Sequence, residues 1–476
     1  MAYTGSVNPT APRPTPFAFA SEIEHMNDNQ GTAPPPPVIP PDGQPIAPPY
    51  EQAQPYPQPG PAYGYGYAPP TPPPPPPNLP DPYATPEAQP ATARMDRTDR
   101  MVLGIGAAGF LLALVIFALM GELGRFLTVG VQIVPLAVLA VLAFAGAKNE
   151  GMAVLAYITL AVVAMAVLLN SFLSALAPVM DLSRALGDTN PADGPPNLLK
   201  PGAGGVVLTA TLLLIISVIV SALMLARPVR AAMARIIPID PDSFVHKIGL
   251  SILTLLLLTS FVPIIALAGK PPILEIINSG GLDVLGDEPV SELDLVFQFI
   301  WTIPAVVFAA GWPVARTLRT ALQRLGMVRP TMLQVTGAIV GAVVLAFAMT
   351  YAVEPAILAL WQALGWTPTD VSAFSGLLQG VTNPLGAILI GVTAGIGEEM
   401  AFRGLLQPRI GLIFANLLFT SVHAFQYGFD ALLSVFIVGT ILGIVRARTN
   451  TSTSAIVHGV YNFTLVMMSV LAATGQ

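Results

Sequence analysis

Long apolar stretches, separated by short charged or glycine-containing loops, fill the chain from about residue 99 to its end. Most of them hold about 20 residues with few charges, which is the length that an α-helix needs to cross a bilayer. The pattern predicts an all-α fold, a polytopic membrane helix bundle with about 10–11 spans. The expected apolar segments are 101–121, 126–147, 151–178, 203–226, 248–269, 294–315, 331–353, 384–408, 411–427, 431–446 and 453–474.

Residues 1–98 have a different composition, because they contain 29 of the 49 prolines. Runs such as "APPPPVIPP" and "TPPPPPPNLP" lack backbone donors and have a fixed φ angle. They predict a disordered, proline-rich tail with polyproline II character. Two roles stay open for this tail: a spacer, or a docking segment for a partner that recognises proline-rich chains.

Composition narrows the class of protein. Hydrophobic residues make up 53 % of the chain and the mean hydropathy is +0.68, values typical of a membrane protein. The absence of cysteine excludes disulfides, thiolate metal sites and cysteine nucleophiles. No basic domain indicates nucleic acid. The first residues lack a charged segment followed by an apolar one, so we expect insertion to begin at the first internal span.

The charges in the loops predict an orientation. If the tail is placed in the cytoplasm, the loops on that side hold 16 lysines and arginines, against 4 in the outer loops, leaving aside Arg13 in the tail. Positively charged loops stay on the cytoplasmic side. We therefore expect a multi-pass protein of the cell membrane with a cytoplasmic N-terminal tail, in contact with membrane lipids.

Ionisable side chains are costly inside lipid unless they are paired or face a polar cavity. The last spans nevertheless contain six polar residues in three short motifs, "GEEMAFRG", "FTSVHAF" and "HGVYNF". They are Glu398, Glu399, Arg403, His423, His458 and Asn462.

Helical spacing divides this set. Glu399 and Arg403 are four residues apart, so they share a helix face and can neutralise one another. Glu398 is rotated by about 100° from Glu399 and stays free. His458 and Asn462 are again four apart, on one face of the last span.

One carboxylate, two imidazoles and one amide can hydrolyse a peptide bond without a covalent intermediate. An acid in an apolar pocket can act as a general base, and the other groups can orient water or donate to an oxyanion. Glu398, His423 and His458 would equally suit a zinc site, although no HExxH motif is present. The alternative is that these groups only tie helices together, in a non-catalytic scaffold or immunity-type protein of the same fold.

The three motifs resemble those of a known family. "EEMAFR" matches EExxxR, "FTSVH" matches FxxxH, and "HGVYN" matches a histidine followed four residues later by asparagine or aspartate. This combination is similar to the CPBP family, which comprises type II CaaX prenyl endopeptidases and Abi-like bacteriocin-processing proteins. These are polytopic intramembrane proteases.

The resemblance implies a role for each of the six residues. Glu398 would activate water with the help of His423, His458 and Asn462 would stabilise the oxyanion, and Glu399 and Arg403 would support the site. It implies a peptide or membrane-protein substrate. The glutamate-dependent mechanism requires no cofactor, and zinc is kept as the alternative. We therefore divide the chain into the tail (1–98), N-terminal transmembrane helices (99–329) and a protease core (330–476).

One expectation concerns the path of the chain. Simple alternation of spans would place Glu398 and His458 toward one side of the membrane and His423 toward the other. The segment 411–427 must therefore be tilted or re-entrant if the site is to close.

Overall fold

The computed structural model describes residues 95–180, 202–278, 290–370, 376 and 378–474. All described residues belong to one compact unit, which lies within Pro75–Gln476. Almost the whole of the predicted tail, 1–98, lies outside the described residues. Its disorder and the proposed domain boundaries stay predictions.

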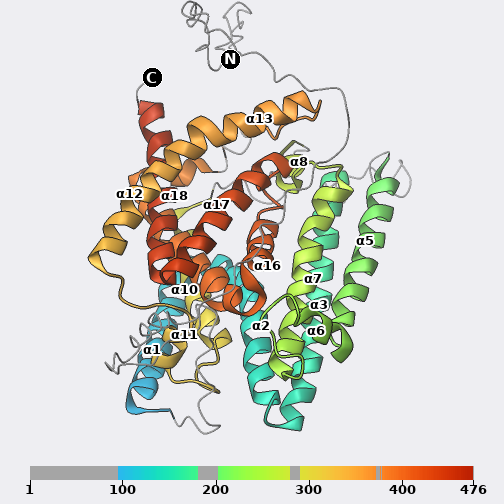
Figure 1. Cartoon of the computed structure of the whole chain (residues 1–476), viewed down its shortest axis with the longest axis vertical. Helices are drawn as coiled ribbons and strands as arrows, with labels where there is room; N and C mark the ends of the chain where they lie inside the picture. Colours follow the sequence, from blue (N-terminus) through green and yellow to red (C-terminus); the bar gives the residue numbers. More distant parts are fainter. Residues whose placement is uncertain (1–94, 181–201, 279–289, 371–375, 377, 475–476) are drawn as a thin grey trace, which may run out of the picture. The chain divides into compact units, whose positions relative to one another are not determined.

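Every regular element of the described part is helical (Figure 1). The elements are α1 (Arg97–Leu119), α2 (Leu123–Gly146), α3 (Glu150–Leu176), η1 (Ala177–Val179), α5 (Ala203–Leu223), α6 (Arg227–Met233), α7 (Phe244–Ala266), α8 (Pro272–Asn278), α10 (Glu292–Ala309), α11 (Leu318–Arg324), α12 (Met332–Ala348), η3 (Met349–Val353), α13 (Glu354–Ala363), η4 (Gln379–Val381), α15 (Pro384–Val392), η5 (Thr393–Leu406), α16 (Gln407–Ser421), α17 (Phe429–Arg448) and α18 (Thr451–Thr474).

Ten helices in the described part are long and apolar enough to cross a membrane. The predicted fold class, an all-α polytopic membrane bundle, is therefore confirmed. One of the ten, Pro384–Ser421, combines the two spans expected at 384–408 and 411–427. Another, Met332–Ala363, is longer than expected, because η3 joins α12 and α13 into one continuous helix.

Buried and half-buried polar residues fix the ends of several helices. Asn383 caps α15 by accepting from Gly386 N at 2.9 Å, and its amide donates to Glu292 Oε1 at 2.9 Å. Asp99, near the start of α1, accepts from Trp312 Nε1 at 3.1 Å and from Leu318 N at 2.8 Å. These bonds connect helices that are distant in the sequence, so they fix register as well as helix ends.

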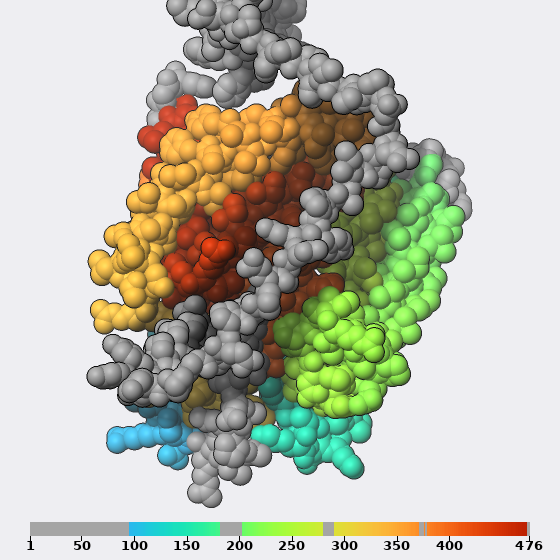
Figure 2. Space-filling model, viewed as in Figure 1, coloured from blue at the N-terminus to red at the C-terminus, as the bar shows by residue number. Residues whose placement is uncertain are grey.

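The last helix, α18, lies at the centre of the C-terminal part, in contact with α12, α15, η5 and α17 (Figure 1). Ala338, Ala342 and Ala346 recur every four residues on α12, and they let it pack closely against Val457 and Tyr461 of α18. In the space-filling view, the orange residues of α12 and α13 lie directly against the red C-terminal helices (Figure 2). Polar groups on η5 and α18 are therefore enclosed by apolar helices.

The N-terminal helices pack beside the C-terminal helices described above. α2, α3, α5 and α7 pack on one another, and α10 contacts both α2 and η5. Met400 of η5 packs in one cluster with Val306 and Trp312, so η5 is enclosed from the α10 side as well.

Candidate functional site

The "GEEMAFRG" motif lies on η5, which is a π-helix over Thr393–Leu406. The spacing of its charged residues predicted an α-helix at this place, so the π-helix is a difference from that prediction. The observed i→i+5 bonding widens the turn and changes the angles between side chains. Long π-helices are rare, and shorter ones often mark functional sites.

Glycines allow α15 and η5 to approach α18 at backbone contact distance. A Cβ atom at Gly395 would lie 2.7 Å from the Ala455 carbonyl oxygen and 2.9 Å from Gly459 Cα. A Cβ atom at Gly391 would lie 2.7 Å from the Gly459 carbonyl oxygen. Only hydrogen fits at these positions, so the close crossing brings the glutamates of η5 next to His458.

Glu399 is the centre of a buried polar network. It is completely buried, and its Oε1 lies 3.3 Å from Arg403 Nη1 and 3.1 Å from His458 Nδ1. The Ser454 hydroxyl lies 2.5 Å from its Oε2. Because a carboxylate only accepts, Nδ1 of His458 carries the proton in this bond. The expected Glu399–Arg403 pair is present, and Glu399 also orients His458.

Arg403 is held by three kinds of contact. It is only 2 % exposed, its Nη2 donates to the Gly439 carbonyl at 3.1 Å, and its Cζ lies 4.1 Å from the centroid of the Phe419 ring. The pair with Glu399 neutralises a charge that would otherwise be very costly at this depth.

Glu398 has a different environment from its neighbour. Its side chain is 29 % exposed, and its Oε2 lies 3.9 Å from His458 Nε2. His458 is buried and therefore sits between the two glutamates, with Nδ1 toward Glu399 and Nε2 toward Glu398. The carboxylate that the sequence analysis expected to be free is thus the accessible one of the two.

A chain reversal brings His423 back toward this network. Gly411 has φ 76° and ψ 169° and breaks the helical path between η5 and the rest of α16. The ring of Phe419 then packs against Phe402 of η5, with 5.3 Å between centroids. The part of α16 after Gly411 therefore folds back against η5.

His423 and His458 meet at the same aromatic ring. The Phe419 ring centroid lies 5.0 Å from that of His423 and 6.0 Å from that of His458. Nδ1 of His423 lies 2.9 Å from the Phe419 carbonyl oxygen. A carbonyl can only accept, so Nδ1 is the protonated nitrogen and, in a neutral imidazole, Nε2 has a free lone pair.

Two residues of this region were missed by the sequence analysis. Ser454 lies one turn before His458 on α18, and the four-residue spacing Ser454–His458–Asn462 was the available signal. Tyr427 stacks on His423, with 6.0 Å between ring centroids and 7° between planes. Tyr427 thus forms part of the aromatic wall beside His423.

Asn462 is the expected site residue that the structure leaves apart. It follows His458 by one turn on α18 and is half-buried. Among the described residues, its side chain forms no hydrogen bond with the other five. Its assignment as an oxyanion donor stays a prediction.

The donors do not suit the zinc alternative. In the described part of the chain, no group of three or more histidine, aspartate or glutamate side chains is arranged to hold a metal ion. Glu398, His423 and His458 therefore do not form a ready ligand set. We derive no step through a metal.

A separate groove of about 460 Å³ runs along the outer side of α15, η5 and α18. Its walls are apolar and include Ile388, Ile396 and Phe463. None of the six polar site residues lines it, so it is distinct from the polar network.

Comparison with known proteins is informative for this region. No curated protein and no solved structure matches the chain. Residues 380–464 match one family model, described as type II CAAX prenyl endopeptidase Rce1-like. The matched segment runs from η4 to α18 and contains all three motifs. Over this segment, the match confirms the CPBP family that the motifs indicated.

Proposed function

We propose that the chain is an intramembrane endopeptidase in which Glu398 activates a water molecule. The observation that carries the proposal is the unequal environment of two adjacent glutamates. The carboxylate of Glu399 is occupied by contacts with Arg403, His458 and Ser454. Glu398 is partly accessible and has no hydrogen-bonding partner among the described residues. If both glutamates only stabilised the fold, neither carboxylate would need to stay accessible and without a hydrogen bond.

The two imidazoles are suited to different steps. His423 holds its proton on Nδ1, so its Nε2 can accept a hydrogen bond from water and orient it. His458 holds its Nδ1 proton toward Glu399, so Nε2 can donate only when the ring is doubly protonated. Carboxylates on both sides of His458 balance the positive charge of that form.

The reaction can be written with these groups. Glu398 takes a proton from water while the water oxygen attacks the carbonyl carbon of the peptide. His458, with Asn462 brought into reach, would donate to the oxyanion that forms. The proton on Glu398 then passes to the leaving nitrogen, the C–N bond breaks, and an acid and an amine are released.

The test compares cells that carry the full-length wild type with cells that carry Glu398→Gln at equal abundance. The substitution keeps the shape and removes the base. We expect membrane-derived peptide fragments that are present with the wild type to disappear with Glu398→Gln. Identical fragment patterns would refute the assignment and would favour a non-catalytic scaffold.

A further inference from the structure

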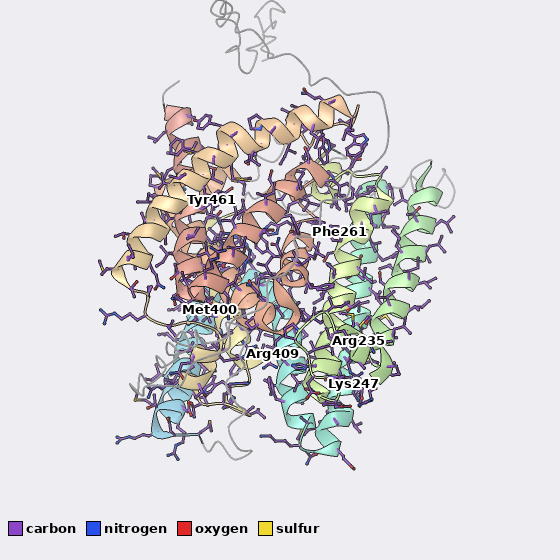
Figure 3. The ribbon with its side chains drawn as sticks, viewed as in Figure 1. Arg235, Lys247, Phe261, Met400, Arg409 and Tyr461 are labelled. Carbon is purple, nitrogen blue, oxygen red and sulfur yellow. The ribbon has the colours of Figure 1, made fainter. Side chains whose placement is uncertain are left out.

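His423 follows directly after the second part of α16, residues 412–421, which we call the His423 arm. The arm begins after Gly411, whose backbone is not helical, so η5 does not set the direction of the arm through a continuous helix. Figure 3 labels Arg409, two residues before this break, at the lower end of the C-terminal helices. Side-chain contacts must therefore fix where the arm places His423 relative to Glu398.

Asn416 links the His423 arm to α17. Its side chain is 3 % exposed, and its Nδ2 donates to the Phe436 carbonyl at 2.8 Å and to Thr440 Oγ1 at 2.9 Å. The Thr440 hydroxyl donates its own proton to the Phe436 carbonyl at 2.8 Å, so its oxygen is left to accept. Both partners require a donor from Asn416, which places the amide nitrogen on this side and Oδ1 on the other.

A glycine of α17 receives the other side of the Asn416 amide. A Cβ atom at Gly439 would overlap Oδ1 of Asn416, and it would lie 2.9 Å from Cδ1 of Phe419. Only hydrogen fits here, so α17 and the His423 arm approach at backbone contact distance. The Gly439 carbonyl also accepts from Arg403 Nη2 at 3.1 Å. The same turn of α17 therefore contacts both the His423 arm and η5.

The position of Asn416 is transmitted to the site along the arm. Asn416, Phe419 and His423 are three and four residues apart, so they follow one another along one side of it. The Phe419 ring centroid lies 5.0 Å from that of His423 and 6.0 Å from that of His458 on α18. A shift of the arm along α17 would therefore move Phe419 and His423 together, relative to His458.

We infer that Asn416 is a positioning residue, which holds the His423 arm in register on α17 so that His423 faces the water beside Glu398. The inference rests on the proposed function, because it gives Asn416 a part in placing the imidazole that orients this water. Asn416 acts through α17 and Phe419 and not on the reacting atoms. A displacement of about 1 Å in such a site can lower the rate about 10²-fold.

Gln407 provides a matched control on the same helix. It is 1 % exposed, and its Nε2 donates to the Gly443 carbonyl of α17 at 2.9 Å. It precedes Gly411, so it is not part of the His423 arm. Asn416→Leu and Gln407→Leu each remove a buried amide that bonds to α17, and they differ in the side of the break on which they lie.

The first measurement is hydrolysis by the purified full chain. The substrate is a synthetic peptide that covers a cleavage site found by comparing wild-type and Glu398→Gln cells. We expect Asn416→Leu to lower kcat about 10²-fold while KM and the kcat of Gln407→Leu change by less than about threefold. Both variants should lower the unfolding temperature by similar amounts. Equal losses of kcat in the two variants, or an unchanged kcat in Asn416→Leu, would overturn the inference.

The second measurement does not depend on peptide hydrolysis. The chain has four histidines, so selective labelling gives few ring signals in a nuclear magnetic resonance spectrum. We expect Asn416→Leu to shift the ring signals of His423 and His458, because the Phe419 ring lies beside both, and Gln407→Leu to leave them in place. Unchanged signals in folded Asn416→Leu would refute the positioning role. Shifted signals in a chain whose wild type hydrolyses no peptide would support it and would refute only the proposed function.

A milder variant serves if Asn416→Leu does not fold. Thr440→Val keeps the shape of the side chain and removes one of the two acceptors of Asn416. We expect it to lower kcat about threefold, as for the loss of one interhelical hydrogen bond in a membrane, and to shift the same histidine signals in the same direction. The absence of both effects would overturn the inference.

Discussion

Replacing Glu399 by alanine should destabilise the membrane domain far more than the same change at Glu398. Glu399 is fully buried and contacts Arg403, His458 and Ser454. Its removal leaves the Arg403 guanidinium, 2 % exposed, without its counter-charge. Breaking a buried ion pair by removing one partner costs about 3–5 kcal/mol. Glu398 is 29 % exposed, so Glu398→Ala should change the free energy of unfolding by less than about 1 kcal/mol.

The assay is unfolding of the full chain in mixed micelles, followed by tryptophan fluorescence. The adjacent glutamates provide a matched pair, because they lie on the same helix and differ only in their surroundings. Both variants should lose peptide hydrolysis, but only Glu399→Ala should lower the free energy of unfolding strongly. Equal stability of Glu399→Ala and the wild type would refute the buried network.

A double variant tests whether the stranded charge is the cause. Glu399→Ala combined with Arg403→Met removes both charges and fills the arginine site with an apolar side chain. We expect it to be more stable than Glu399→Ala alone, because no unpaired charge remains. Additive losses from the two changes would show that Arg403 contributes through packing on Phe419 instead.

Further predictions concern single positions. Asn462→Ala should lower kcat by about 10²–10³ if the amide donates to the oxyanion, and a change in KM alone would contradict this role. Ser454→Ala should lower the free energy of unfolding by about 1–3 kcal/mol, because Glu399 loses a hydrogen-bond donor. An unchanged unfolding midpoint would contradict a stabilising role of this hydrogen bond. Gly395→Ala should destabilise by about 1–3 kcal/mol, since its Cβ would lie 2.7 Å from the Ala455 carbonyl oxygen. Gly397→Ala is the control, because its nearest neighbour atom would lie at 3.6 Å. Prolonged chelation of divalent metals should leave the rate of peptide hydrolysis unchanged, and loss of activity restored by zinc would reinstate the metal alternative.

Local spacing correctly predicted one contact inside the membrane helices. The ion pair between Glu399 and Arg403 followed from a separation of four residues, which survives the change from α- to π-helix. The separate environment of Glu398, which is rotated away from this pair and is 29 % exposed, followed in the same way. Tyr427 was missed because its contact with His423 depends on how the neighbouring segments pack. Ser454 has the four-residue spacing from His458, but its bond to Glu399 depends on the packing of α18 on η5.

The amino-acid sequence by itself determined the membrane-spanning segments, the polar residues inside them and the family over 380–464, because hydrophobic length and short motifs are local properties. Only the tertiary structure decided how these residues meet. The positive φ at Gly411 reverses the chain and returns His423, and the glycine contact between η5 and α18 places His458 between two glutamates. These arrangements arise from contacts between distant segments, which no local pattern records.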